Sequence, residues 1–525
     1  MRKRPKWKGC MTLLLKTLQA NEKALILALL TTLVIVRIAS TNVNSAEWGD
    51  SYRILEASRA IRQFTYPENE KRPPLFSAIL AVRPQGVDEI TWARGYMLVT
   101  TLLTLFVFGK FAKVFIKSAK WLLLAVVFLL INPIFYYWSL RVYADVLFAL
   151  LVLTNFYFFE IWKGSQSLKH ALVLGIVCGF SILTRFEGYL LLAATLVGLV
   201  YTTITDRTAK PLLTKLKQPL LAFISTGLII IPWLVYKNPL ASSYFEEPAG
   251  REYGLTMLAT YVVSYLFILG VVPSFALAFS WDKNKFANLG KYSNIAAFVI
   301  LESILILVWP AALPRLFMPI LPIFVLLFVL SVQHCFSGNN RRVIVALATF
   351  CLVVLYILFQ GYLRLQFLGS HTLVFICIAL VSTLAALSML LRKLRLFLLF
   401  SLVSALGMLG SVIYLHKDVY KTIKDVSVRA SRERAGKVIH NDTSGIVDWY
   451  LNTNKASSTY QNLVDKKFLK ETYLQNEHVT YIVITNEHDP NLDIDLKKRP
   501  YLSLIDVSEN RVGGKMFHTW LVQVN

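Results

Sequence analysis

Apolar runs long enough to cross a lipid bilayer recur along most of this chain, and they constrain its fold more than any other feature. A transmembrane helix needs about 17–25 mostly apolar residues, and such runs follow one another until about residue 415. Hydrophobic residues make up 56% of the 525 residues and charged residues only 16%, whereas soluble domains average roughly 45–50% and 25%. One soluble core could not bury that much apolar surface. The sequence therefore predicts a multi-pass integral membrane protein.

The apolar runs predict an all-α polytopic membrane bundle of about 13 transmembrane helices. The predicted spans are 24–40, 93–109, 121–138, 145–162, 171–186, 188–204, 219–236, 256–280, 293–310, 316–333, 343–361, 372–391 and 396–415. A basic stretch precedes the first run, as in a signal peptide, but no small-residue cleavage site follows it. We therefore interpret 24–40 as an uncleaved span.

The distribution of basic residues predicts the orientation of the bundle. The formal charge is +24, but the lysines and arginines lie in short loops between apolar runs, so no nucleic-acid partner is expected. Cytoplasmic loops of membrane proteins are rich in these residues. With the N-terminus inside, the inside loops hold Lys110, Lys113, Lys117, Lys120, Lys163, Lys169, Arg207, Lys210, Lys215, Lys217, Lys283, Lys285, Lys291, Arg341, Arg342, Arg392, Lys393 and Arg395. An odd number of spans then places the C-terminal segment on the outer face.

Residues 416–525 have the composition of a soluble protein, and we expect a small extracytoplasmic α/β domain there, after a transmembrane domain at 1–415. Helices are predicted at 428–440 and 444–451, and strands at 478–485, 501–507 and 519–524. None of the five cysteines lies in this segment. The absence of cysteines favours a prokaryotic plasma membrane over the endoplasmic reticulum.

Two predicted outer segments are longer than a simple connection requires. Residues 41–92 form a polar loop with a helix-like stretch at 50–64, in which Asp50 occupies the position of an N-cap. The second outer loop covers about 237–255. Loops of this length in a compact bundle are usually functional.

Ionisable side chains are costly in hydrocarbon, so their positions are informative. Apart from Glu302, they gather at the outer ends of the predicted spans: Asp50, Arg141, Asp145, Arg185, Glu187 and Arg315. Each also has a structural interpretation. Asp50 can be only a helix cap, and Arg141 and Asp145 have the i, i+4 spacing of a helical ion pair. Arg315 can anchor a span at the membrane interface.

Several short motifs follow one another along the chain: Asp50-Ser51-Tyr52, Lys71-Arg72-Pro73-Pro74-Leu75, Asp145 opening a span, Gly175 to Gly179 followed by Thr184-Arg185, and Arg315 to Pro322. Together they resemble the GT-C superfamily of integral membrane glycosyltransferases, especially protein O-mannosyltransferases and the transferases that add aminoarabinose to lipid A. Ser51 stands where that family often has Glu, Arg72 where it often has His, and Leu316 where Tyr is usual. The first two departures leave the metal requirement and the subfamily open.

The resemblance implies transfer of a sugar from a polyprenyl-phosphate donor, which the membrane lipids hold, to an acceptor on the outer face. The acceptor is a protein hydroxyl, a lipid or a glycan, and the anomeric centre is inverted in a single displacement. A carboxylate can take the acceptor's proton. We assign that role to Asp50, with Glu47 and Asp145 as further catalytic candidates. Asp145 would orient the acceptor, hold a metal ion or fix an arginine.

The leaving phosphate gains charge as the sugar departs, so arginines should surround it. Arg315, Arg185 and Arg72 are the predicted phosphate-binding residues. No cofactor is assigned, and a divalent metal ion is left open. We also expect that removal of the chain beyond about Lys421 would leave the catalytic groups in place.

A secondary transporter of a polar or lipid-linked substrate is the main alternative. Such a protein would place ionisable residues near the bilayer midplane and interrupt helices at matching positions of two halves. This chain instead keeps its charges at one face. A scaffold or receptor is a third class, and it would have no reason to align carboxylates and arginines at one interface. Release of polyprenyl phosphate by the purified protein would distinguish an enzyme from a transporter.

Overall fold

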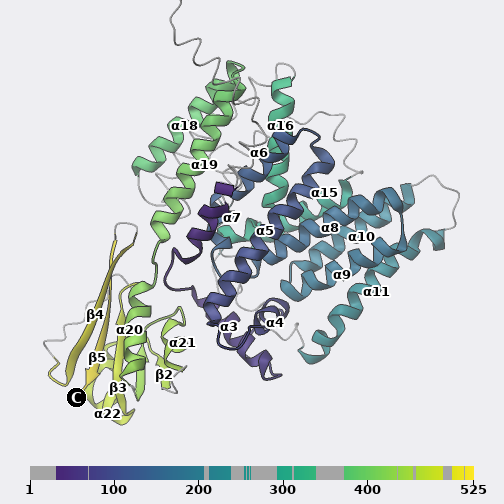
Figure 1. Ribbon diagram of the computed structural model, residues 1–525. Helices are drawn as coiled ribbons and strands as arrows, with labels where there is room; N and C mark the ends of the chain where they lie inside the picture. Colours follow the sequence, from purple (N-terminus) through teal and green to yellow (C-terminus); the bar gives the residue numbers. More distant parts are fainter. Residues whose placement is uncertain are drawn as a thin grey trace, which may run out of the picture.

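The computed structural model shows a helical bundle with a smaller, strand-containing domain at its C-terminal end (Figure 1). It describes residues 31–205 except 33 and 69, then 212–237, 253–255, 257–258, 261, 292–309, 313–337, 372–433, 436–452, 457–488, 499–512 and 515–525. The predicted span 343–361 lies outside these residues, as do nearly all of the predicted span 256–280 and of the predicted outer loop 237–255.

Helices coincide with the predicted spans wherever the chain is described. They are α5 (Glu89–Phe115), α6 (Ala119–Leu130), α7 (Pro133–Ser139), α8 (Asp145–Ser165), α9 (Leu168–Thr184), α10 (Gly188–Thr205), α11 (Leu212–Tyr236), α15 (Ser293–Val308), α16 (Leu321–Ser337), α18 (Thr372–Leu390) and α19 (Leu394–His416). Among the described residues, five helices are long and apolar enough to cross a membrane, or six if the bent pair α6–α7 is one span. The count of 13 stays a prediction.

The predicted span 121–138 is not one straight helix. Helices α6 and α7 meet at an angle of 57°. Pro133 cannot donate a backbone hydrogen bond into the preceding turn, so it favours a break there. The Asn132 side chain then accepts hydrogen bonds from the backbone N–H groups of Ile134 and Phe135, at 2.9 and 3.2 Å, and starts α7 as an N-cap. The break directs the chain into the turn that carries Tyr143.

The end of the first predicted span carries a charge that the sequence analysis overlooked. Arg37 is 1% exposed, and its Nη2 donates to the carbonyl oxygen of Ser139 at 2.6 Å and to the Ser139 hydroxyl at 3.2 Å. Charged side chains inside membrane proteins usually face the bundle and find such partners. This arginine therefore fixes the start of the described chain to the end of α7.

The segment 41–92, which the sequence predicts to lie on the outer face, contains a short 3-10 helix, η1 (Ser40–Asn42), at its start, followed by α3 (Gly49–Arg62) and α4 (Leu75–Ala81). Asp50 is not the N-cap of α3, as the sequence had suggested. Trp48 occupies that position, and no side chain caps the helix. The Asp50 carboxylate is turned toward arginines instead.

The C-terminal domain is a five-stranded mixed sheet with helices packed on it. Its elements are α20 (Lys421–Arg432), β1 (Lys437–His440), α21 (Ile446–Asn452), β2 (Ser457–Tyr460), η7 (Lys466–Leu469), α22 (Glu471–Asn476), β3 (Val479–Thr485), β4 (Leu502–Val512) and β5 (Lys515–Val524). The strand order is β2-β1-β3-β5-β4. β1 is parallel to both β2 and β3, whereas β5 is antiparallel to β3 and β4. The predicted helix at 428–440 is wrong in its second half, because 437–440 is the strand β1.

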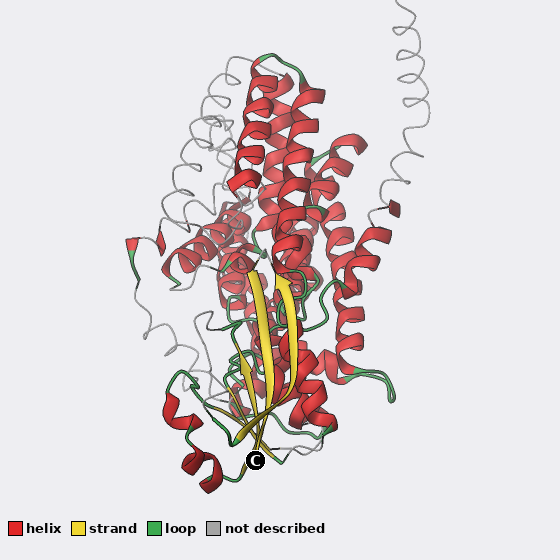
Figure 2. Cartoon of the chain, turned by 90° about the vertical axis from the view of Figure 1, so that its left-hand side faces the viewer, coloured by secondary structure: helices red, strands yellow, loops and turns green. Residues whose placement is uncertain are grey.

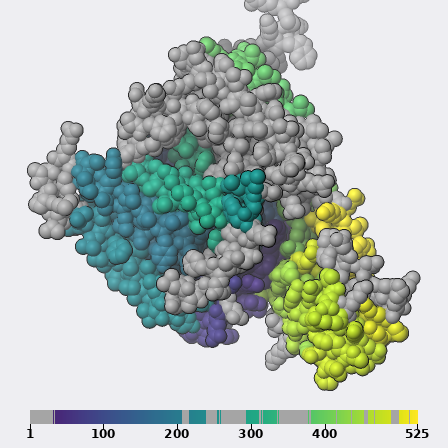
Figure 3. Space-filling model, turned by 180° about the vertical axis from the view of Figure 1, so that it is seen from behind, coloured from purple at the N-terminus to yellow at the C-terminus, as the bar shows by residue number. Residues whose placement is uncertain are grey.

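Helix α20 covers the sheet with an apolar stripe. Ile423, Val426 and Ala430 are buried at the three- and four-residue spacing of one helix face, and α20 packs against β3, β4 and β5. The strands lie together at one end of the molecule (Figure 2). From behind, the C-terminal segment forms a lobe beside the helical part (Figure 3). In Figure 1, α20 and α21 lie between the sheet and α3.

Helices α9 and α11 approach so closely that only glycine fits between them. A Cβ on Gly175 would lie 1.9 Å from Ser225 Oγ and 2.2 Å from the carbonyl oxygen of Ala222. The Thr226 hydroxyl donates to the Gly175 carbonyl at 2.9 Å. Small residues permit such close packing of membrane helices. The Gly-rich motif of α9 thus has a packing role.

We expect Gly175→Ala to destabilise the protein by roughly 1–3 kcal/mol, because the added methyl group overpacks the α9–α11 contact. Gly164→Ala is the matched control, since a Cβ at Gly164 on α8 meets no atom within 4 Å. Thermal unfolding of both variants in detergent measures the difference. Equal unfolding temperatures would contradict the assigned packing role.

Candidate active site

The carboxylate of Asp50 lies between two arginines that are distant in sequence. Asp50 is the second residue of α3. Its Oδ1 is 2.5 Å from Arg72 Nη2, and its Oδ2 is 2.9 Å from Arg315 Nη2. Burial raises the pKa of Asp50, but the charges of Arg72 and Arg315 outweigh burial, so this pKa lies below its ordinary value. Asp50 is therefore an anion in this arrangement.

Arg72 is positioned by the loop that precedes α4. Glu70, 5% exposed, accepts hydrogen bonds from both the backbone N–H and the Nη1 of Arg72, each at 2.9 Å. The Tyr66 hydroxyl donates to the Arg72 carbonyl at 2.8 Å. Burial lowers the pKa of Arg72, but Asp50 and Glu70 outweigh it and raise this pKa above its ordinary value. The guanidinium thus stays charged between two carboxylates.

Lys237, just beyond the end of α11, ties this loop to the bundle. Its ammonium donates to three carbonyl oxygens of the loop: those of Pro67 and Glu68 at 3.1 Å each, and that of Glu70. It also lies 5.0 Å from the centre of the Tyr66 ring. An ammonium group has three N–H donors, and each has a backbone acceptor here. No pattern in the sequence identified Lys237.

Arg315 belongs to a short 3-10 helix, η5 (Pro314–Phe317), that leads into α16. Its guanidinium carbon lies 4.6 Å from the centre of the Tyr143 ring and 6.0 Å from that of Trp138. Such contacts stabilise a cation over an aromatic face. Burial lowers the pKa of Arg315, but Asp145, Tyr143 and Asp50 raise it above its ordinary value. Both Asp50 and Asp145 thus stabilise the charged form of Arg315.

Asp145 and Arg185 form a second ion pair next to the first. Asp145, the first residue of α8, is 1% exposed, and its Oδ1 lies 2.6 Å from Arg185 Nη1. Arg185 follows the last residue of α9 and also pairs with Glu187. Of the roles considered for Asp145, fixing an arginine is the one that these contacts describe.

One structural interpretation of this region is wrong. Arg141 does not pair with Asp145, because its Nη1 donates to the Ala46 carbonyl at 2.8 Å and its Nη2 to the Tyr137 hydroxyl at 3.0 Å. Arg185 and Glu187 lie at the turn between α9 and α10, and both are largely buried and paired with each other. The ion pairs of Asp50 and of Asp145 form one network, since Arg315 interacts with both carboxylates.

Glu47 lies apart from the two ion pairs. It is 1% exposed, its Oε1 is 2.7 Å from Arg94 Nη2 on α5, and its Oε2 accepts from the Val142 backbone N–H at 3.3 Å. These contacts fix the start of the outer loop to α5 and to the turn before α8. Its catalytic role stays a prediction that the contacts do not favour.

Among the residues described, no three His, Cys, Asp or Glu side chains come together as metal ligands would. Asp50 and Asp145 each bind an arginine in this arrangement.

Sequence reasoning missed three members of the network: Tyr143, Glu70 and Lys237. Tyr143 lies between Arg141 and Asp145, and Glu70 immediately precedes Lys71-Arg72, so both were adjacent to motifs already singled out. The positions of Tyr143 and Glu70 beside these motifs could therefore have indicated that they belong to the network.

We expect Lys237→Met to loosen the loop that positions Arg72. Loss of the ammonium contacts should cost about 1–2 kcal/mol at this partly exposed position. The amide of Arg72 should then exchange hydrogen roughly 5- to 30-fold faster. Hydrogen exchange read by mass spectrometry on peptides covering 64–74 measures this rate. Lys421→Met, which removes an exposed pair with Asp425, is the control, and equal exchange in both variants would refute the role of Lys237.

The structure superposes on known membrane glycosyltransferases. The crystal structure of ArnT from Cupriavidus metallidurans bound to undecaprenyl phosphate matches with a TM-score of 0.59 at 14% identity, covering 95% of this chain and 98% of that chain. The apo state of the same protein matches with a TM-score of 0.58 at 13% identity, covering 96% of this chain and 98% of that chain. The arabinosyltransferase EmbB from Mycobacterium smegmatis matches with a TM-score of 0.51 at 13% identity, covering 73% of this chain and 40% of that one.

The sequence comparison points in the same direction. Residues 71–236 match the family described as dolichyl-phosphate-mannose-protein mannosyltransferases, and this segment contains Arg72, Asp145 and Arg185. No curated protein matches the chain in sequence. The chain is thus an integral membrane protein with the GT-C fold, and it resembles that superfamily in its motifs, in its family match and in its tertiary structure.

Proposed function

We propose that this protein transfers a sugar from a polyprenyl-phosphate-linked donor to an acceptor hydroxyl on the outer face of the membrane. The observation that carries the proposal is the placement of Asp50 between Arg72 and Arg315, 2.5 and 2.9 Å from their nitrogens. The two arginines, which can bind an anion, are thereby adjacent to Asp50, which can accept a proton. The likeness to a protein bound to undecaprenyl phosphate supports a lipid-linked donor.

The proposed reaction is a single displacement. The acceptor's oxygen attacks the anomeric carbon, and its proton passes to the Asp50 carboxylate. The bond between the anomeric carbon and the phosphate oxygen breaks, and its electron pair stays on that oxygen. The products are the inverted glycoside and polyprenyl phosphate. Arg72 and Arg315 stabilise the charge that grows on the leaving phosphate.

A carboxylate paired with two arginines is a weak base, because their charges hold its pKa low. The donor phosphate resolves this conflict in the proposed mechanism. Its oxygens offer the guanidinium groups stronger acceptors, so Arg72 and Arg315 turn toward the phosphate and their hold on Asp50 weakens. The basicity of Asp50 then rises only when the donor is bound, which also limits transfer to water.

Asp145 and Arg185 have a supporting place in this proposal. Asp145 raises the pKa of Arg315, and it pairs with Arg185 at 2.6 Å. A second guanidinium beside the first gives the phosphate a further contact. The sugar, and whether the acceptor is a protein, a lipid or a glycan, do not follow from these residues.

We expect Asp50→Asn to fold, insert and bind donor lipid, while sugar transfer falls at least about 100-fold, because an amide cannot take the acceptor's proton. Release of polyprenyl phosphate from a polyprenyl-phosphate sugar by the purified protein measures the rate. Asp88→Asn is the control, since Asp88 is an exposed N-cap of α5 and asparagine caps a helix equally well. Near-normal transfer by Asp50→Asn would remove Asp50 from the mechanism.

The proposed outer-face location requires the C-terminal domain to be outside. We expect a tag after Asn525 to be accessible from outside intact cells and a tag before Met1 to be accessible only after the membrane is opened, in keeping with the positive-inside rule. Protease protection of the two tags measures this. Cleavage of the C-terminal tag from the cytoplasmic side alone would reverse the topology and the location of the site.

A further inference from the structure

The first turn of α3, which carries Asp50, touches the C-terminal domain at two points. At Gly49 the two backbones meet, because an added Cβ would lie 2.7 Å from the carbonyl oxygen of Ser444. At Trp48, the residue before the helix, the indole lies 6.1 Å from the Tyr420 ring between centroids, in an edge-on arrangement. The two residues that immediately precede the candidate base are thus in contact with the C-terminal domain.

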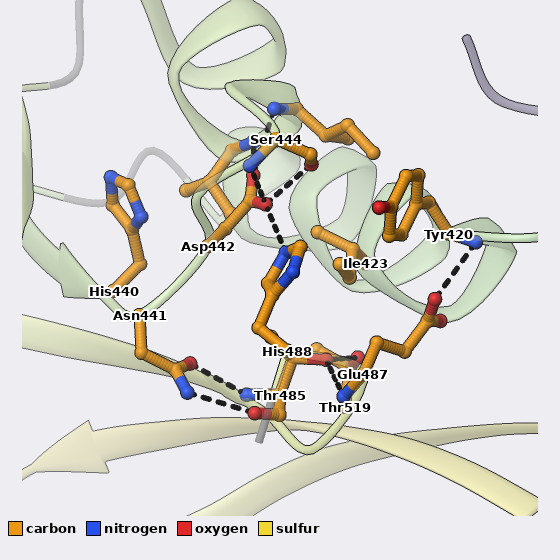
Figure 4. A network of polar contacts seen from close by, with 12 residues as sticks. Tyr420, Ile423, His440, Asn441, Asp442, Ser444, Thr485, Glu487, His488 and Thr519 are labelled. Carbon is orange, nitrogen blue, oxygen red and sulfur yellow. Dashed lines mark hydrogen bonds and ion pairs between the residues drawn. The ribbon is translucent and has the colours of Figure 1, made fainter. Parts of the chain in front are cut away.

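Both contacts connect to one pair in the C-terminal domain, the buried Asp442 and the partly buried His488 (Figure 4). Asp442 accepts hydrogen bonds from the backbone N–H of Ser444, at 2.7 Å, and from its hydroxyl. His488 Nε2 lies 3.0 Å from Asp442 Oδ1. The His488 ring packs against Tyr420, and the two ring centroids are 5.4 Å apart. One carboxylate and one imidazole therefore support both contacts with α3.

The pair is rigid because Asp442 is fully enclosed and fully bonded. Its Oδ2 accepts from the backbone N–H groups of Ile446 and Val447 at 2.8 and 3.0 Å. Burial raises the pKa of Asp442, but the hydrogen bonds from His488, Ser444 and Val447 outweigh burial and lower it. Buried polar networks that are fully satisfied fix a single conformation. The turn from residue 442 to residue 445 therefore holds Ser444 in a fixed position against Gly49.

The topology of the sheet brings the two halves of the pair together. Asp442 follows β1 and His488 follows β3, and these neighbouring strands are parallel. The carboxyl ends of parallel strands lie at the same edge of a sheet, where α/β folds place their functional loops. In Figure 1, α20 and α21 are the helices of this domain that lie next to α3.

Further contacts hold α3 independently of the pair. Tyr52 lies 5.5 Å from the Trp449 ring, and the Arg59 guanidinium carbon lies 3.7 Å from the centre of that ring. These contacts with α21 keep the helix docked when the first turn is disturbed. A change in the pair should thus shift the first turn without releasing the helix.

We propose that the Asp442–His488 pair of the C-terminal domain is a positioning device for Asp50. It holds Ser444 against Gly49 and Tyr420 against Trp48, and so it sets where the Asp50 carboxylate stands relative to Arg72 and Arg315. The inference rests on the proposed function of Asp50 as the base. It also revises the expectation that residues beyond Lys421 could be removed with the catalytic groups left in place.

The test compares His488→Ala with Gly49→Ala, because they disturb the same contact from opposite sides. Displacement of a reacting group by about 1 Å can cost up to 100-fold in rate. We expect each variant to lower kcat 10- to 100-fold and to change donor KM less than about threefold. His518→Ala is the control, since this histidine lies on β5 of the same domain and pairs with the exposed Glu509.

The double variant distinguishes positioning from general destabilisation. If both changes act by moving the first turn of α3, their effects on kcat should be non-additive, with the double variant close to the worse single one. Additive losses, or a normal kcat per folded molecule in Gly49→Ala, would overturn the proposal. Gly49→Ala alone decides the matter if His488→Ala fails to fold, because Gly49 lies outside the C-terminal domain.

The controls separate this proposal from the proposed function. Normal kcat in His488→Ala and Gly49→Ala, together with an inactive Asp50→Asn, would refute the positioning role and leave the base in place. An active Asp50→Asn variant would refute the role of Asp50 as the base, and with it the role of the Asp442–His488 pair in positioning that base.

Discussion

The ion pairs of Asp50 with Arg72 and Arg315 connect helix α3 and the loop before α4 with the short helix η5, which is distant in the sequence. A buried charge is costly unless it is paired and hydrogen-bonded. Each of these side chains is partly buried, so a group that leaves its partner loses stabilisation unless another partner replaces it. The two ion pairs therefore fix the position of segment 41–92 on the bundle.

The network is built so that every arginine has more than one partner. Arg72 has Glu70 in addition to Asp50, and Arg315 has Tyr143 beneath it and Asp145 nearby. Arg185 has both Asp145 and Glu187. Because of this redundancy, an incoming phosphate can draw a guanidinium away from Asp50 without leaving it unsupported.

The structure brings five of the six predicted site residues into one region and leaves Glu47 apart. The sequence could place Asp50, Asp145, Arg185 and Arg315 at the same face, because each lies at the outer end of a predicted span. It could not say which charges pair. Arg141 and Asp145 have the spacing of a helical ion pair, yet the break before α7 and the turn at Tyr143 direct Arg141 toward Ala46 and leave Asp145 to Arg185. Pairing depends on side-chain directions that spacing does not contain.

The sequence by itself determined the helices of the bundle, the gathering of charged residues at one end of the spans and the α/β character of the C-terminal domain. These follow from local properties: the length of apolar runs, the cost of charge in hydrocarbon and the periodicity of short segments. Only the tertiary structure decided that α6 and α7 are separate helices, that 437–440 is a strand, and that the C-terminal domain contacts the turn carrying Asp50. The break between α6 and α7 begins at Pro133, whereas strand β1 depends on its pairing with β2 and β3. The contact of Gly49 with Ser444 joins residues hundreds of positions apart, and no local pattern encodes a contact at that separation.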